Sequence, residues 1–115
     1  MAELHRERCQ ACTGETPTVE AEERAQLLTE LDGAWQVEGN RLRRRYQFPD
    51  FAAAFAWATR IGLLAEHEGH HPELRIGWGY LEVELTTHAV TGLTRNDFIL
   101  AAKLDRLGTR PANGG

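Results

Sequence analysis

The residues best suited to chemistry in this sequence are its histidines. Five occur in 115 residues, and His67, His70 and His71 lie within residues 66–72. A fourth, His88, follows a segment of alternating apolar residues. An imidazole can take up or release a proton near neutral pH, and it can also bind a transition metal. The cluster therefore indicates either acid and base catalysis or a metal site.

The cluster contains a His-Glu-x-x-His sequence, from His67 to His71. In zinc peptidases this spacing places two histidines on one face of a helix, where they bind the metal while the glutamate activates a water. Gly69 lies inside the motif and Pro72 follows it, so the helix that must align both imidazoles is expected to end there. The sequence thus argues against a zinc peptidase. A purely structural role, in which a histidine at a helix end interacts with the dipole, best suits His67 and His5.

Cys9 and Cys12 form a Cys-x-x-Cys sequence in a polar N-terminal segment. Two thiols cannot build a disulfide framework, so the fold must be stable through packing alone. Two interpretations stay open for the pair. It is either an inert or redox-active dithiol, or half of a zinc site with His5 as a further ligand and the remainder supplied by a second chain.

Composition narrows the possible functions. The chain carries 13 basic and 17 acidic residues, a formal net charge of -4. Net acidity argues against nucleic-acid binding through bulk charge, because phosphate contacts draw on clustered lysine and arginine. No apolar run approaches the roughly 20 residues that span a bilayer, and the N-terminus lacks the apolar stretch of a signal peptide. We therefore expect one cytoplasmic domain with no membrane or nucleic-acid partner.

Five elements are expected to position the histidines. Apolar spacing and turn residues predict a helix over 18–31, a hairpin over 35–48, a helix that Asp50 caps and that ends near Gly69, a hairpin over 74–87, and a helix from a capping box at 94–97 to about Gly108. Arg44 is the one charged residue on the apolar side of its strand.

This order of elements predicts an α+β fold, with a four-stranded antiparallel sheet and three helices packed on one face. Residues 18–108 are expected to form the domain. Residues 1–17, with the two cysteines, are expected to be a flexible arm, and residues 109–115 a disordered tail.

A wider pattern surrounds the histidines. Its residues are Ala65-Glu66, His70-His71-Pro72-Glu73, Trp78, Val83, Leu85, Thr87-His88, Gly92-Leu93-Thr94, Asp97 and Leu100-Ala101. This pattern resembles the signature of the pterin-4a-carbinolamine dehydratase family, and the resemblance extends over residues 27–107. The Cys-x-x-Cys sequence and the stretch from Arg95 to Phe98 are most similar to the bacterial members that accompany phenylalanine hydroxylase.

The resemblance implies dehydration of 4a-hydroxytetrahydropterin to quinonoid dihydropterin and water, which recycles the cofactor of aromatic amino-acid hydroxylases. This step needs one proton delivered to the leaving hydroxyl and one removed from ring N5, so it requires neither a metal nor a cofactor. By the same resemblance His70 is the base at N5, His88 is the acid, and His71 is an orienting or proton-relay group. Asp97 orients or electrostatically supports one imidazole.

The resemblance also implies which residues contact the substrate: Pro72, Thr87, the backbone of Ala89 and Val90, Glu66 as a partner of a catalytic group, and Trp78 as a pocket wall or as part of the core. A homodimer or homotetramer is expected, with a functional link to phenylalanine hydroxylase. Relatives of this fold also act as a dimerisation cofactor for a homeodomain transcription factor and as an assembly factor for a carbon-fixing enzyme. A scaffold role is therefore the alternative, and the complete set of histidines and aspartate favours the enzyme.

Overall fold

The computed structural model describes residues 3–107. The elements in chain order are η1 (Leu4–Arg6), α1 (Ala21–Leu28), β1 (Gln36–Glu38), β2 (Arg41–Gln47), α2 (Phe51–Glu68), β3 (Glu73–Gly77), β4 (Tyr80–Leu85), η2 (His88–Val90) and α3 (Arg95–Asp105). The tail expected to be disordered, residues 109–115, lies outside the described residues.

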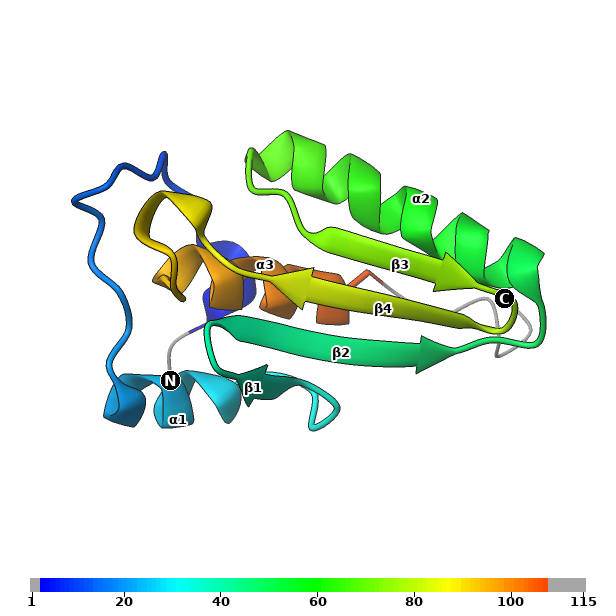
Figure 1. The fold of residues 1–115 in the computed structure, drawn as a ribbon, viewed down its shortest axis with the longest axis horizontal. Coiled ribbons are helices and arrows are strands. Elements are labelled where there is room, and N and C mark those ends of the chain that lie inside the picture. The colour runs from blue at the N-terminus through cyan, green and yellow to red at the C-terminus, as the bar shows by residue number, and fades with distance from the viewer. Residues whose placement is uncertain (1–2, 108–115) are drawn as a thin grey trace.

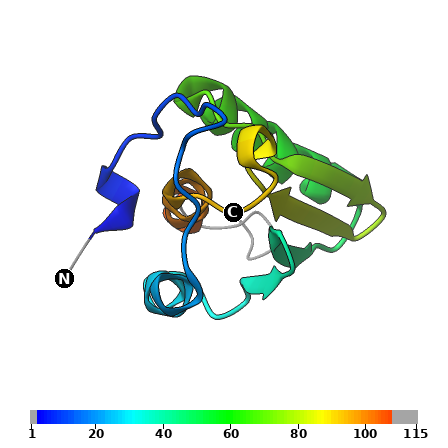
Figure 2. The ribbon, with the colours of Figure 1, turned by 60° about the vertical axis from the view of Figure 1, so that its left-hand side comes forward.

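The four strands form one antiparallel sheet in the order β1-β2-β4-β3. The three α-helices lie on one side of this sheet, with α3 behind its centre and α2 along the β3 edge (Figure 1, Figure 2). The predicted α+β fold is confirmed. Within residues 3–107, no helix is long and apolar enough to cross a membrane.

The core lies between the sheet and the helices. Along β4 every second side chain points inward, as the period of a strand requires, and Leu81, Val83 and Leu85 are fully buried. The opposite layer is α3, which is buried on most of its surface because α2 and η1 also pack against it. The strand that leads to His88 and the helix that carries Asp97 are therefore both fixed by the core.

The open face of the sheet carries a ladder of ion pairs that includes most of the arginines of β2. Its members pair between strands: Arg41 with Glu84, Arg43 with Glu38 and Glu84, Arg45 with Glu82, and Arg75 with Glu82. Opposite charges on neighbouring strands stabilise a sheet modestly. The outward arginines of β2 are thus balanced by carboxylates of the same face.

Arg44 faces the helices rather than solvent, and α3 supplies its counter-ion. Its Nη1 donates to Asp105 Oδ1 at 2.7 Å, and its guanidinium lies 4.3 Å from the centre of the Tyr46 ring. Asp105 also accepts from the indole N–H of Trp35 and from the backbone N–H of Asp32, each at 2.8 Å. Burial raises the pKa of Asp105 against these favourable contacts. A charged residue on the apolar side of β2 is therefore accommodated by a half-buried polar cluster.

Asp105→Ala is expected to destabilise the protein, because it leaves the Arg44 guanidinium partly buried without its main partner. We expect a loss of about 2–4 kcal/mol in the free energy of unfolding, measured by urea denaturation. The matched control is Asp32→Ala, since Asp32 is half exposed and 3.7 Å from Arg44, a distance and exposure that give about 0–1 kcal/mol. Equal losses for the two variants would contradict this account.

Both ends of α2 follow the sequence prediction. Asp50 caps the start, because its Oδ1 accepts from the backbone N–H of Ala53 at 2.8 Å. At the other end Gly69 adopts a left-handed backbone, with φ +68°, which ends the helix at low cost for a residue without Cβ. The backbone N–H of His70 then donates back to the carbonyl of Ala65. The chain therefore turns at Gly69, and His67 lies on the helix while His71 lies beyond it.

The first helix is shorter than the predicted 18–31. It ends at Leu28, and the next backbone bonds, from Glu30 to Leu27 and from Leu31 to Leu28, span only three residues. The hydroxyl of Thr29 also donates back to the carbonyl of Gln26 at 2.6 Å. Apolar spacing continues through this tighter turn, which is why the sequence pattern overestimated the helix.

The described part of the N-terminal arm, residues 3–17, contacts α3. Leu4 is buried, and the carboxylate of Glu7 accepts two hydrogen bonds from the Arg95 guanidinium at 2.8 and 2.7 Å. The same Arg95 hydrogen bond holds the pKa of Glu7 below its usual range. The flexibility expected for this segment in solution stays a prediction. The structure shows that the segment packs against α3.

Candidate active site

The centre of the candidate site is a buried cluster of four hydrogen-bonded side chains, His70, Thr87, Thr94 and Asp97, here called the buried quartet. Asp97 is fully buried, and its Oδ1 lies 2.6 Å from His70 Nε2. Its Oδ2 accepts from the Thr87 hydroxyl at 2.8 Å and from the backbone N–H of Thr94 at 2.9 Å. The two threonine hydroxyls are 2.9 Å apart. Both carboxylate oxygens of Asp97 are therefore engaged.

Three chain segments meet at this point. His70 follows the left-handed turn at Gly69, Thr87 follows β4, and Asp97 lies in the first turn of α3. The predicted capping box is visible in the bond from the Thr94 N–H to Asp97. A carboxylate is favoured in the first turn of a helix, where unpaired N–H groups give positive potential. The α3 terminus thus stabilises the charge of the group that holds His70.

The arrangement defines what His70 can do. An ionised carboxylate can only accept, so the Nε2 of His70 is the nitrogen that carries the proton toward Asp97. Among the described residues, no hydrogen bond uses the other ring nitrogen, Nδ1. A neutral imidazole with its proton on Nε2 has a free lone pair on Nδ1, which makes His70 a suitable general base.

His71 and His88 lie outside the buried quartet. His71 Nε2 is 2.8 Å from Glu66 Oε1, and both side chains are largely exposed. His88 is exposed in η2, the short helix that directly follows Thr87. The three predicted catalytic histidines therefore have different surroundings: one is buried against a carboxylate, one is paired with an exposed carboxylate, and one is exposed beside the quartet.

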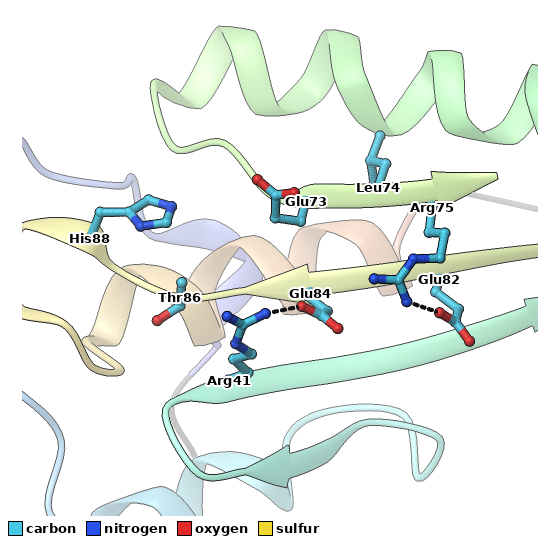
Figure 3. A pocket seen from close by; sticks show the side chains of 8 residues that line it. All are labelled: Arg41, Glu73, Leu74, Arg75, Glu82, Glu84, Thr86 and His88. Carbon is cyan, nitrogen blue, oxygen red and sulfur yellow. Dashed lines mark hydrogen bonds and ion pairs between the residues drawn. The ribbon is translucent and has the colours of Figure 1, made fainter.

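A pocket of about 210 Å³ opens on the face of the sheet beside His88. It is lined by Arg41, Glu73, Leu74, Arg75, Glu82, Glu84, Thr86 and His88. Figure 3 shows the His88 ring at one end, the Glu73 carboxylate near the middle, and the pairs Arg41–Glu84 and Arg75–Glu82 along the pocket. A hydrogen bond from Arg45 holds the pKa of Glu82 below its usual range, so the pocket keeps its charged lining at neutral pH. The pocket therefore offers a ligand both positively and negatively charged side chains.

The remaining predicted contacts are distributed unequally. Pro72, Ala89 and Val90 lie within two residues of a predicted catalytic histidine in the sequence, and Ala89 is exposed in η2. Trp78 is 75% exposed in the turn between β3 and β4, so the prediction that it packs in the core is wrong. That turn lies at the opposite end of β4 from η2 (Figure 1). Within one chain, the length of β4 separates Trp78 from His88.

The cysteine pair lies against the first turn of α3, beside the buried quartet. Both thiols are free and contact Asn96, the residue before Asp97. Within residues 3–107, no group of three or more histidine, cysteine, aspartate or glutamate side chains is arranged to hold a metal ion.

Comparison with known proteins identifies the family of this chain. Residues 17–107 match the family model described as pterin 4 alpha carbinolamine dehydratase. The chain belongs to this family. The matched range contains the buried quartet, His71, His88 and every strand of the sheet.

Individual pterin dehydratase relatives match over nearly the whole chain. A protein of Rickettsia canadensis named "Putative pterin-4-alpha-carbinolamine dehydratase" is 46% identical over 91% of this chain and 97% of its own. One of the same name from Rubrobacter xylanophilus is 41% identical over 93% of this chain and all of its own. A crystal structure of a transcriptional coactivator/pterin dehydratase from Brucella melitensis superimposes with a TM-score of 0.74, at 29% identity, over 81% of this chain and all of that one.

A further solved structure shares the pterin dehydratase fold. It is a pterin dehydratase-like protein identified as a RuBisCO assembly factor in the alpha-carboxysome, with a TM-score of 0.51 and 24% identity over 64% of this chain and 84% of that one. At this identity the likeness concerns the fold alone.

Several residues to which the sequence motif gave no role lie at the candidate site of this member of the pterin dehydratase family. Thr94 was predicted only as a helix cap, yet it shares Asp97 with His70. Glu73 and Thr86 line the pocket beside His88. Their outward position could have been found from the strand alternation, since residues 73 and 75 of β3 face the same side as 82 and 84 of β4.

Proposed function

We propose that this pterin dehydratase homologue catalyses the dehydration of 4a-hydroxytetrahydropterin to quinonoid dihydropterin and water. The observation that carries the proposal is the buried His70–Asp97 pair, found in a chain whose family is named for this reaction. A buried, carboxylate-bound imidazole with one free nitrogen is suited to taking a proton from a ring nitrogen.

The reaction is two proton transfers around one bond cleavage. The bond between C4a and the hydroxyl oxygen breaks, and the oxygen leaves as water after receiving a proton. Ring N5 loses its proton, and its electron pair forms the N5–C4a double bond. No electrons are gained or lost overall. A base and an acid on opposite sides of the C4a–N5 bond are sufficient.

His70 acts as the base in this proposal. Its Nδ1 takes the N5 proton, while Asp97 holds the Nε2 proton and balances the positive charge that develops on the ring. Because Asp97 is fully buried, this compensation operates with little screening by water. Thr87 and the Thr94 N–H keep the carboxylate oriented.

The exposed histidines complete the proton transfers. His88 delivers a proton to the leaving hydroxyl, and its exposure in η2 lets it exchange protons with solvent between turnovers. His71, held by Glu66, orients the substrate or relays a proton. Imidazole suits both tasks because it donates and accepts protons near neutral pH.

The pterin ring is proposed to bind against Pro72, Thr87 and η2. Among the described residues, the backbone N–H of Ala89 takes part in no hydrogen bond, whereas the N–H of Val90 donates to Thr87. An unpaired N–H on an exposed turn is a ready donor to the polar edge of a pterin. The pterin contact is thus a backbone contact at Ala89 and a packing contact at Pro72.

The same proposal covers the cellular setting. The product re-enters the cofactor cycle of an aromatic amino-acid hydroxylase, with phenylalanine hydroxylase as the expected functional partner, in the cytoplasm. A homodimer or homotetramer is the proposed assembly.

The direct test generates 4a-hydroxytetrahydropterin with phenylalanine hydroxylase and follows its decay by ultraviolet absorbance in stopped flow. Added protein is expected to raise the first-order decay rate in proportion to its concentration, and boiled protein is expected to leave it unchanged. If the decay rate is the same with and without native protein, the proposed function is wrong.

Thr87→Val is expected to reduce kcat about 5- to 30-fold, because an isosteric side chain removes one hydrogen bond to Asp97 worth about 1–2 kcal/mol. The matched control is Thr87→Ser, which keeps the hydroxyl and should retain most of the wild-type rate. Both variants are assayed in stopped flow with melting temperatures recorded. A serine variant as slow as the valine variant would show that the methyl packing matters, and not the hydroxyl.

A scaffold function is the second candidate, favoured by the Brucella relative described as a coactivator as well as a dehydratase. Phe51, Phe55 and Leu63 of α2 are exposed apolar side chains outside the buried quartet. A complex with a protein partner that persists in a His70→Ala/His88→Ala variant would support this role. Loss of the complex in that variant would count against it.

A further inference from the structure

We propose that Cys9 and Cys12 form a redox-active dithiol, which a low-molecular-weight disulfide oxidises to an intramolecular Cys9–Cys12 disulfide, and that this oxidation detaches the arm segment from Cys9 to Cys12 from α3. This inference concerns a modification site outside the proposed proton-transfer groups. It rests on the contacts that both cysteines make with one residue of α3.

Both sulfur atoms lie against Asn96. The Cys9 thiol donates to the backbone carbonyl of Asn96 at a distance of 3.6 Å, and Asn96 Nδ2 donates to Cys12 Sγ at 3.0 Å. Both thiols are free and partly exposed. Both cysteines of the Cys-x-x-Cys sequence therefore contact the same residue, Asn96.

Asn96 is also the main anchor of the arm between the cysteines. Its Oδ1 accepts from the backbone N–H of Gln10 at 3.0 Å, and its Nδ2 donates to the Gln10 carbonyl at 2.6 Å. The backbone N–H of Cys9 adds a bond to Glu68 Oε1 at 3.1 Å. Asn96 is buried, so these hydrogen bonds are partly shielded from water. The arm is thus attached through the segment that a disulfide would close.

Disulfide geometry conflicts with this attachment. A disulfide requires Cα atoms about 4.4–6.8 Å apart, which residues three positions apart reach when they form a turn. Residues 8–13 form neither turn nor helix. Closing the bond must therefore bend the chain at Gln10 and withdraw that residue, or one sulfur, from Asn96. The dithiol form is therefore compatible with the segment bound to Asn96, whereas the disulfide form requires that the segment leave Asn96.

The surroundings assign different roles to the two thiols. Cys12 borders a hollow of about 640 Å³ between the arm and α3, wide enough to admit a small disulfide. Cys9 is more enclosed, and burial, with a contribution from Glu68, raises its pKa to about 12. Cys12 is therefore the first nucleophile and Cys9 the second.

The exchange balances as follows. Cys12 loses its proton and attacks one sulfur of the small disulfide, whose other half leaves as a thiol. Cys9 then loses its proton and attacks the Cys12 sulfur of the mixed disulfide, releasing the second half as a thiol. Two electrons pass from the dithiol to the small disulfide, and two small thiols are formed.

Detachment of this segment affects the buried His70–Asp97 pair through the segment's two anchors, Asn96 and Glu68. Asn96 precedes Asp97, and Glu68 lies two residues before His70. Release of both anchors loosens the two segments that hold the pair. A lower dehydration rate in the oxidised form is therefore expected, and this last consequence rests on the proposed function.

The first measurement uses the full chain equilibrated in glutathione redox buffers, alkylated and analysed by mass spectrometry. Wild type is expected to form the internal disulfide without retained glutathione. Cys9→Ser is expected to retain one glutathione at Cys12, whereas Cys12→Ser is expected to remain unmodified at neutral pH. A wild-type protein that stays a dithiol in oxidised glutathione, or that retains glutathione at both cysteines, overturns the proposal.

The second measurement is tryptic cleavage after Arg8, which needs no substrate. The disulfide form is expected to be cut on the order of 10-fold faster than the dithiol form, with reduction restoring the slow rate. The control is the Cys9→Ser/Cys12→Ser double variant, expected to be cut equally in both buffers. Equal cleavage of the two wild-type forms overturns arm release. A protein without dehydratase activity that still shows both results would contradict only the proposed function.

Discussion

Replacing His70 and His88 together with alanine is expected to return the decay of 4a-hydroxytetrahydropterin to its uncatalysed rate. The double variant removes the proposed base and the proposed acid at once. Each positioned proton-transfer group contributes about 10²–10⁴-fold. Because the uncatalysed reaction is itself measurable, the stopped-flow trace with the variant should superimpose on the trace without protein.

The fold must survive for this result to be informative. His70 is buried, so its removal leaves Asp97 without one hydrogen bond, at a cost of about 1–3 kcal/mol in the free energy of unfolding. Circular dichroism and a thermal melt establish that the variant is folded at the assay temperature. The matched control is His67→Ala, because His67 is exposed on α2 within the same cluster of the sequence. If the folded double variant accelerates the decay of 4a-hydroxytetrahydropterin as much as wild type does, neither histidine takes part in the mechanism.

Asp97→Asn is expected to lower kcat by about 10²–10⁴-fold with little change in KM. The substitution keeps the shape of the side chain but introduces an N–H donor opposite His70. His70 then accepts at Nε2 and carries its proton on Nδ1, the atom proposed to take the N5 proton. The compensating negative charge is lost as well. KM should change little because Asp97 is fully buried, so we expect no direct contact between this side chain and the substrate.

Two comparisons separate this effect from simple destabilisation. Glu66→Gln makes the same chemical change at the exposed carboxylate that holds His71, and we expect less than a 10-fold loss there, since an exposed pair contributes about 0–1 kcal/mol. Nuclear magnetic resonance of the His70 ring reports the tautomer directly, with the proton on Nε2 in wild type and on Nδ1 in Asp97→Asn. An asparagine variant with the wild-type tautomer and the wild-type rate would contradict the role given to Asp97.

The fold could be predicted because residues close by in the sequence determine where its main helices and strands begin and end. Asp50 and Gly69 delimit α2, and the alternation after Gly79 defines β4. The length of α1 could not be predicted, because a three-residue turn keeps the apolar spacing of a helix. The partner of Arg44 was also beyond a local pattern, since Asp105 lies 61 residues away in the chain.

The sequence motif named candidate residues for the site but not the contacts between them, and the catalytic roles of these residues stay predictions. The motif named His70, His71, His88 and Asp97, but it did not say which imidazole the aspartate holds. The pairing of His70 with Asp97 depends on the turn at Gly69, which directs the His70 side chain toward the first turn of α3. These two residues are 27 positions apart in the sequence. The docking of the arm on α3 was missed for the same reason, since its bonds join residues more than 80 positions apart.

The buried quartet has a consequence for how the protein folds. All four of its members lie between residues 70 and 97, one uninterrupted stretch that contains the β3–β4 hairpin. Closing loops of this length costs less chain entropy than joining distant segments. The stretch can therefore bring its own hydrogen-bonding partners together early, before the N-terminal arm finds α3. The proton-transfer centre is, in this sense, a local structure that the rest of the chain encloses.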